Sequence, residues 1–234
     1  MEGPALQSPM RRLLLAALVL PDPESLLQQL RPKPNAYREW FEAIHKDDTR
    51  VLRTLLARGF DPNSIEPERF DSGLILAVRL KSTKVVALLL DTPDINIDAR
   101  SQNGDTALMV AAYQSDTDTA LALIGKGAEI NRPGWTALHY AAASGNVSII
   151  RKLLEESAYI DAESPNRTTP LMMAARSGHR DAIQLLLEEG ADVLLKNEAG
   201  LDAADFARAQ GFLGLAHDLE LAIKTHSGTK PSAD

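Results

Sequence analysis

The sequence predicts an all-α protein made of about six helix-turn-helix units stacked in a row, and three observations predict it. Similar segments recur along the chain: GDTALMVAAYQSD at 104–116, GWTALHYAAASGN at 134–146 and RTTPLMMAARSGH at 167–179. Their spacing is nearly constant, since Thr136 and Thr169 lie 33 residues apart and Thr106 lies 30 before Thr136. An alanine also recurs five residues after the threonine position in six successive units: Ala43, Ala77, Ala111, Ala141, Ala174 and Ala207. A fixed period of this length is typical of repeat proteins, whose units bury their apolar faces against one another.

The first helix of each unit is expected to be short, capped and thin. Thr136 and Thr169 offer a side-chain oxygen to the unpaired N–H groups at the helix start. Pro170 stands at the first helical position, where its missing N–H costs nothing. Gly145 and Gly178 favour the left-handed conformation that ends a helix. The Ala-Ala pair between these signals keeps the helix thin, so that neighbouring units can approach closely.

The second helix of each unit is expected to join the units through an apolar stripe. Segments 51–63, 85–98, 120–131, 149–161 and 182–194 share this stripe, and most end in a Gly-Ala-Asp-like turn. Gly59, Gly127 and Gly190 are expected to end their helices in the left-handed conformation. Among the apolar residues, Leu154 and Leu187 are predicted to lie in the core between units.

The motif T-P-L-H-x-A-A with this period resembles the ankyrin repeat, and TALHYAA around His139 and TTPLMMAA around Pro170 match it best. The resemblance covers residues 35–223 and implies an ankyrin-repeat solenoid with repeats at about 36–69, 70–103, 104–133, 134–166, 167–199 and 200–223. It also implies that His139 bonds the turn of its own repeat. The first and last units depart from the motif, with Arg38 and Asp202 at the threonine position. Such departures are expected where the ends of a stack face water.

The segments outside the repeats allow several interpretations. Residues 1–34 read as a leader followed by a proline-rich linker, and 11–20 join two arginines to an apolar run of eight. This pattern is typical of a secretory signal peptide, which would make the protein similar to exported, periplasmic ankyrin proteins of bacteria. The alternatives are a short helix packed on the first repeat or a disordered leader, and a cytoplasmic location instead of export. Residues 224–234 are expected to form a disordered tail.

Composition and motifs argue against several classes of function. The net charge of −7 disfavours binding to nucleic acid, which relies on a basic surface. There is no cysteine, no paired-histidine motif and no phosphate-binding loop, so we expect no metal, no cofactor and no catalytic residues. Eight apolar residues are too few for a membrane span. We therefore expect a non-enzymatic protein, and a monomer.

Partners of proteins that resemble this one dock on the concave side, on the loop tips and the exposed end of the first helix. The candidate partner-binding residues are Arg79, Tyr113, Gln114, Ser144 and Arg176 at helix ends, and Arg100, Arg132, Trp135 and Arg167 at loop tips. Arg79, Tyr113 and Arg176 are favoured because each follows its capping position by seven residues, which places them in one exposed row. Arginine and tyrosine are also preferred interface anchors.

The sequence alone does not decide the role of two features beside this row. Trp135 either anchors a partner or covers the neighbouring loop. The loop 131–134 is three residues short, which either shapes the binding surface or is a tolerated deletion.

The resulting hypothesis is a protein-protein interaction module that binds one protein partner. The alternative is a dedicated regulator of a partner enzyme: an inhibitor, an immunity protein or a protective factor. Arginines on the concave side of an acidic protein suggest an acidic partner surface, since charge complementarity favours encounter and specificity.

Overall fold

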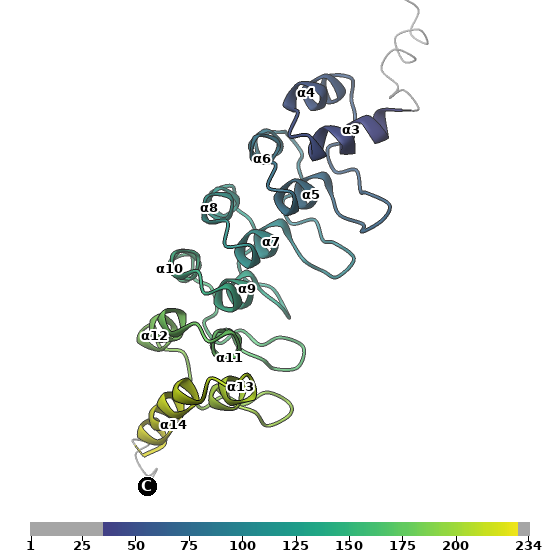
Figure 1. Ribbon diagram of the computed structural model, residues 1–234. Helices are drawn as coiled ribbons and strands as arrows, with labels where there is room; N and C mark the ends of the chain where they lie inside the picture. The colour runs from purple at the N-terminus through teal and green to yellow at the C-terminus, as the bar shows by residue number, and fades with distance from the viewer. Residues whose placement is uncertain (1–34, 229–234) are drawn as a thin grey trace, which may run out of the picture.

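A computed structural model describes residues 35–228, which form six pairs of antiparallel helices stacked in one row (Figure 1). The first helices of the pairs, here called inner helices, are α3 (Ala36–His45), α5 (Gly73–Arg79), α7 (Ala107–Tyr113), α9 (Ala137–Ser144), α11 (Pro170–Ser177) and α13 (Ala203–Ala209). The outer helices are α4 (Thr49–Ala57), α6 (Thr83–Leu90), α8 (Thr117–Gly125), α10 (Val147–Glu155), α12 (Arg180–Glu188) and α14 (Leu213–Gly228). Extended pairing within 35–228 is limited to one isolated bridge between Ile65 and Ser72. The predicted all-α repeat fold is confirmed.

The inner helices begin and end where the sequence signals stand. The hydroxyl oxygens of Thr106 and Thr169 accept hydrogen bonds from the backbone N–H groups three residues later, at 3.3 and 3.4 Å. Gly145 and Gly178 end α9 and α11 with φ of 72° and 74°. Both glycines also lie under a ring of the next repeat. A Cβ on Gly145 would stand 2.5 Å from the His179 ring, so only glycine fits both the turn and the contact.

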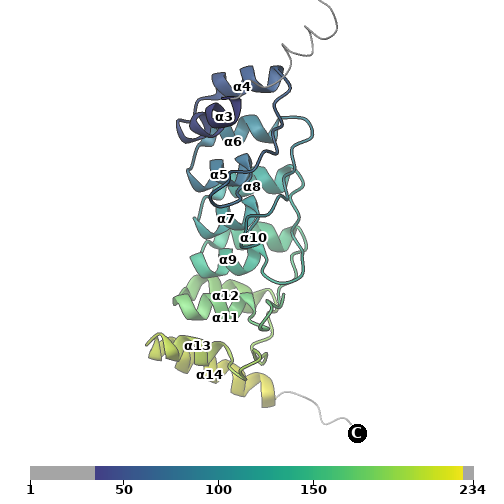
Figure 2. The same ribbon diagram turned by 90° about the vertical axis from the view of Figure 1, so that its right-hand side faces the viewer.

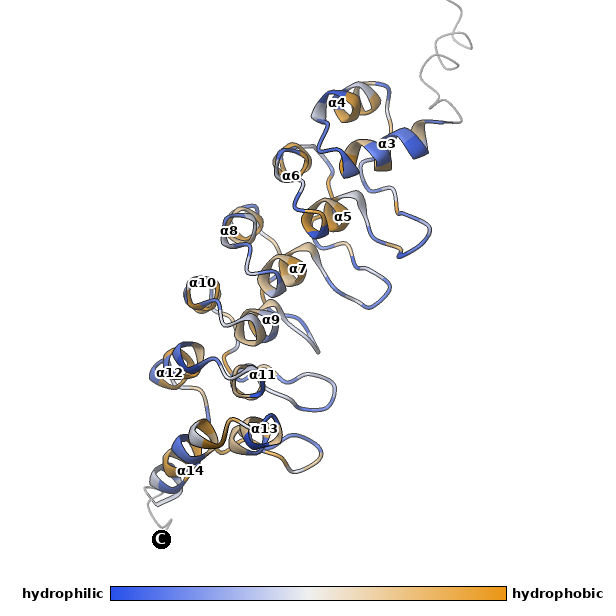
Figure 3. Cartoon of the chain, in the orientation of Figure 1, coloured by the Kyte–Doolittle hydropathy of each residue, from blue (hydrophilic) through white to orange (hydrophobic). Residues whose placement is uncertain are grey.

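One apolar core runs along the stack between the inner and outer helices. The six recurring alanines are all buried, which lets neighbouring inner helices lie side by side (Figure 1). Apolar residues concentrate where the helices face each other, and the projecting loops are largely hydrophilic (Figure 3). Each repeat therefore buries its apolar surface only by stacking on the next.

The prediction that Leu154 and Leu187 lie in this core is wrong by one residue. Both are half-buried at its edge, whereas Leu153 and Leu186 are completely buried. Adjacent positions on a helix point about 100° apart, so Leu154 and Leu187 are turned away from the direction in which Leu153 and Leu186 are buried.

Four of the loops that precede inner helices are short hairpins, here called fingers 1, 2, 4 and 5, and they project from one side of the stack (Figures 1 and 2). Each is closed by a backbone hydrogen bond: Glu66 N to Asp71 O, Ser101 N to Asp105 O, Ser164 N to Thr168 O and Asn197 N to Leu201 O, at 2.8 to 3.0 Å. The shorter loop 131–134 takes the place of the third finger.

The C-terminal helix extends further than expected. Helix α14 continues to Gly228, so residues 224–228 are helical, and the prediction of a disordered tail is wrong for them. The rest of the tail and the whole leader, including the apolar segment 11–20, lie outside the described residues. Within 35–228, no helix combines the length and the apolar character that a membrane span requires.

Candidate partner-binding surface

The predicted docking side of the stack is formed by the fingers and by the C-terminal ends of the inner helices, and we call it the finger face. Arg79, Tyr113 and Arg176 lie at or next to the last residue of α5, α7 and α11, at equivalent positions of their repeats. Tyr113 is 64% exposed, and Arg176 is also exposed. These two residues have the accessibility that an interface anchor needs.

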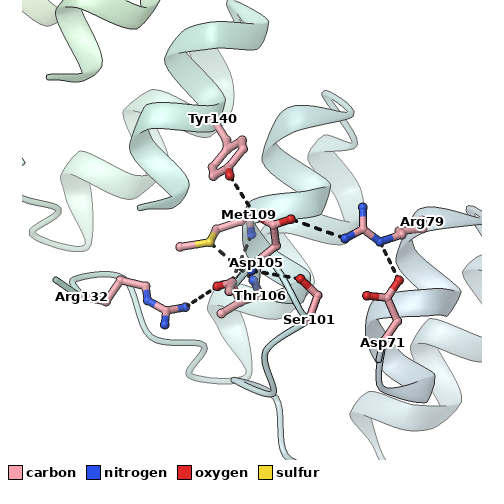
Figure 4. A network of polar contacts seen from close by, with 9 residues as sticks. Asp71, Arg79, Ser101, Asp105, Thr106, Met109, Arg132 and Tyr140 are labelled. Atoms are coloured by element: carbon pink, nitrogen blue, oxygen red, sulfur yellow. Dashed lines mark hydrogen bonds and ion pairs between the residues drawn. The ribbon is translucent and has the colours of Figure 1, made fainter. Parts of the chain in front are cut away.

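The expectation that Arg79 is exposed in the free protein is wrong. Only 28% of its side chain is exposed. Its Nε donates to Oδ2 of Asp71 at 2.7 Å, and its Nη2 lies 3.5 Å from Oδ2 of Asp105 (Figure 4). The guanidinium therefore joins the second and third repeats.

Arg79 belongs to a polar network that extends into the fourth repeat (Figure 4). The Tyr140 hydroxyl donates to Oδ1 of Asp105 at 2.8 Å. Burial, followed by the hydrogen bond to the Asp105 carboxylate, raises the pKa of Tyr140, so the phenol stays protonated at neutral pH. Asp71 itself is completely buried. The network fixes three successive repeats relative to one another at the base of the finger face.

An aromatic cluster lies next to this network. The ring of Tyr113 packs edge-on against Tyr140, with centroids 6.1 Å apart. Half-buried Trp135 contacts Tyr140 and His139, with centroids 6.4 and 5.2 Å away. These contacts favour the interpretation of Trp135 as a cover over its interpretation as an anchor. The ring covers the first turn of its own helix, α9, and also Tyr140.

His139 has the structural role that the resemblance implies, and a second role besides. It is completely buried, and Nδ1 lies 3.2 Å from Thr136 N and 2.9 Å from Thr136 Oγ1. Its Nε2 lies 2.9 Å from the carbonyl oxygen of Thr168 in the next repeat. With Nδ1 accepting from the Thr136 N–H, Nε2 carries the proton and donates to that carbonyl. Burial lowers the pKa of His139 to about 4, so the ring is neutral.

Two more candidates at helix ends brace adjacent repeats. Gln114 donates from Nε2 to the carbonyl of Arg79 at 3.0 Å, and Ser144 donates from Oγ to the carbonyl of Ala112 at 2.8 Å. Both side chains are half-buried. Their hydrogen bonds indicate a structural role in the free protein.

The arginines at the loop tips differ in their surroundings. Arg132 is half-buried, and its Nη1 lies 3.5 Å from the carbonyl of Gly104. Arg167 is exposed and forms an ion pair with Glu163 at 3.0 Å, within finger 4. Arg100 is exposed, before finger 2. Arg100 and Arg176 therefore remain as the more accessible cationic candidates.

Some surface features escaped the sequence analysis. Phe70 in finger 1 is 52% exposed, and Leu201 at the end of finger 5 is 42% exposed. Asp71 and Asp105 were missed as partners of Arg79, although each directly precedes a capping residue. Asp71 and Asp105 stand at the same position of neighbouring repeats, and such positions lie side by side in the stack. Their shared position relative to the capping residue is the signal that could have revealed them as joint partners of Arg79. Trp135 occupies the same position in the fourth repeat.

Within residues 35–228, no group of three or more acidic or histidine side chains could hold a metal ion. The finger face offers instead an exposed aromatic ring, the exposed apolar residues Phe70 and Leu201 in fingers 1 and 5, and hydrogen-bonding side chains. This combination is typical of protein interfaces.

Comparisons with known proteins agree with this geometry. The family model described as ankyrin repeats (3 copies) matches residues 40–133 and again 130–197. The chain is 33% identical over 164 residues to the tyrosine-protein kinase Shark of Drosophila melanogaster, a match that covers 68% of this chain and 18% of the kinase.

Two further relatives are a human cation channel and a mouse nuclear factor subunit. The chain is 28% identical over 162 residues to the transient receptor potential cation channel subfamily A member 1 of Homo sapiens, covering 64% of this chain and 14% of the channel. It is 35% identical over 128 residues to the nuclear factor NF-kappa-B p105 subunit of Mus musculus, covering 53% of this chain and 12% of that protein. The chain spans less than a fifth of the length of each of these relatives. Because the family model covers more than half of the sequence, the chain belongs to the ankyrin-repeat family.

Proposed function

We propose that the chain binds a protein partner on its finger face, with Tyr113 as the central anchor. Ankyrin repeats are a protein-protein interaction module, and the proposal concerns where and how this member binds. One observation carries it: Tyr113 is 64% exposed while its ring rests on a fixed base. That base is Tyr140, whose hydroxyl is held by Asp105. A tyrosine held in this way loses little conformational freedom on binding, which favours its use as an anchor.

Neighbouring features support the same location. Leu80, after the end of α5, is 40% exposed and belongs to the repeat before that of Tyr113. The loop 131–134 is shorter than the fingers, so it projects less far from the stack than they do, beside the aromatic cluster. Apolar area at the centre with arginines around it is the composition expected of an interface.

The charge of the partner has to be reconsidered. Arg79 and Arg167 are paired with carboxylates of this chain, so they present little free positive charge. Their pairing removes the main support for an acidic partner. Arg100 and Arg176 are the residues that would still contact acidic groups.

The experiment is capture of the partner from the native source, followed by calorimetry with purified components. Tyr113→Ala should weaken binding by about 1–3 kcal/mol, the usual cost of removing an interface anchor. Tyr159→Ala is the matched control, because Tyr159 is 69% exposed and follows α10, and it has no part in the ring contacts of Tyr113, Tyr140 and Trp135. Equal effects of the two substitutions would contradict the proposal. If the captured partner is an enzyme, its activity with and without this chain tests the regulator alternative.

A further inference from the structure

A polar cleft lies between fingers 1 and 2, beside the aromatic cluster. Its volume is about 280 Å³, and its lining includes Glu68, Arg69, Asp71, Arg79 and Ser101. The rim residues Glu68 and Arg69 are exposed, whereas Asp71 at the base is completely buried. The cleft is therefore large enough for one side chain of a partner and has a buried acid at its base.

Asp71 is only partly satisfied by its own protein. Its Oδ2 accepts the short hydrogen bond from Arg79 Nε. Its Oδ1 is buried and has no hydrogen-bond partner among the described residues. This oxygen points away from the guanidinium, toward the side of Ser101 (Figure 4). A buried carboxylate oxygen without a donor is costly, so a donor that reaches it gains a favourable interaction.

The charges around the cleft favour a cationic donor. Arg79 is shared by two carboxylates, because it pairs with Asp71 at 2.7 Å and with Asp105 at 3.5 Å. The rim residues Glu68 and Arg69 carry opposite charges. Tyr140 donates to Asp105 without adding charge. The group of Asp71, Asp105 and Arg79 therefore has one more negative than positive charge, and it lies partly out of water, where electrostatic attraction is stronger than at an open surface.

We propose that this cleft receives the side chain of an arginine or a lysine of the protein partner, with Asp71 Oδ1 as the acceptor. The inference rests on the proposed function, since it names one contact of the finger face. Because Oδ1 is shielded from water, neighbouring side chains must move aside when the cation enters. Four of the lining residues are exposed, which leaves the rim free to rearrange: Glu68, Arg69, Gln102 and Asn103.

The test uses the full chain labelled with ¹⁵N and titrated with Nα-acetyl-arginine amide, observed by amide chemical shifts. Nα-acetyl-citrulline amide is the neutral control of the same shape. We expect the arginine derivative to shift amides of residues 68–72 and 101–105, and to bind at least fivefold more tightly than citrulline. Weak binding is expected from so small a probe.

Three variants sharpen the result. Asp71→Asn retains an oxygen for Arg79 but removes the charge, so it should abolish the preference for arginine over citrulline. Arg69→Gln removes the repelling cation at the rim and should strengthen arginine binding severalfold. Glu163→Gln removes an exposed carboxylate from finger 4 and should change nothing at the cleft.

The inference is overturned if citrulline binds as well as arginine, if the shifts fall elsewhere, or if Asp71→Asn stays folded and keeps the preference. Should Asp71→Asn fail to fold, the absence of any strengthening in Arg69→Gln overturns it. A captured partner that responds to Tyr113→Ala but not to Asp71→Asn rejects the cleft and leaves the proposed function standing. Failure to capture a partner counts against the proposed function, while the titration still decides the cleft.

Discussion

Protonation of His139 should destabilise the fold, because the buried ring is neutral and both of its nitrogens are engaged between two repeats. Burial lowers its pKa from 6.5 to about 4 in the folded protein. The unfolded chain therefore binds a proton more readily than the folded one between these two values. The contribution of His139 to the free energy of unfolding is fully present above pH 6.5 and is lost as the pH falls toward 4.

The size of the effect follows from the gap between the two pKa values. Each pH unit within the gap is worth about 1.4 kcal/mol for one proton. The total loss between pH 6.5 and 4 is then about 3 kcal/mol, a large fraction of the stability of an ordinary domain.

The assay is urea unfolding followed by circular dichroism at several pH values between 4 and 7.5. His139→Gln should be less stable at neutral pH, but it should lose little further stability on acidification through this range. His217→Gln is the control, since His217 is exposed on α14 and its replacement should leave the pH dependence unchanged. A wild-type pH dependence that persists in His139→Gln would refute the reasoning.

Two further predictions concern the core and the leader. Leu153→Ala should cost about 2–5 kcal/mol of unfolding free energy, because it removes a completely buried side chain and leaves a cavity. Leu154→Ala should cost less than half as much, since that side chain is half-buried at the edge of the core. Urea unfolding of both variants measures the difference. Equal losses would show that the core contacts are misplaced. If residues 11–20 act as a secretory signal, N-terminal sequencing of protein from the native source should begin after residue 20. An intact Met1 or Met10 on that protein would reject export.

The local chemistry of the repeat explains why so much of the fold was predictable. Thr106 and Thr169 cap helices through bonds that span three residues, and Gly145 and Gly178 end helices through their own backbone conformation. Signals of this kind lie within one repeat and can be read from the sequence directly. The fixed period then places equivalent residues side by side, which predicts the stack.

The errors occurred where the outcome depends on neighbouring repeats. Arg79 has the spacing of an exposed anchor, but its partners Asp71 and Asp105 come from different fingers. Which of Leu153 and Leu154 faces the core depends on how the inner helices pack, and both residues are equally apolar. Patterns within one repeat do not contain this information, whereas comparison of equal offsets across repeats recovers part of it.

Hydrogen-deuterium exchange of the chain, alone and with its captured partner, would locate the binding surface on the stack. Binding on the finger face should slow exchange at the fingers and at the C-terminal ends of α5 and α7, around Tyr113. Protection confined to the outer helices α6, α8 and α10 would place the partner on the opposite side of the stack and rule out binding on the finger face.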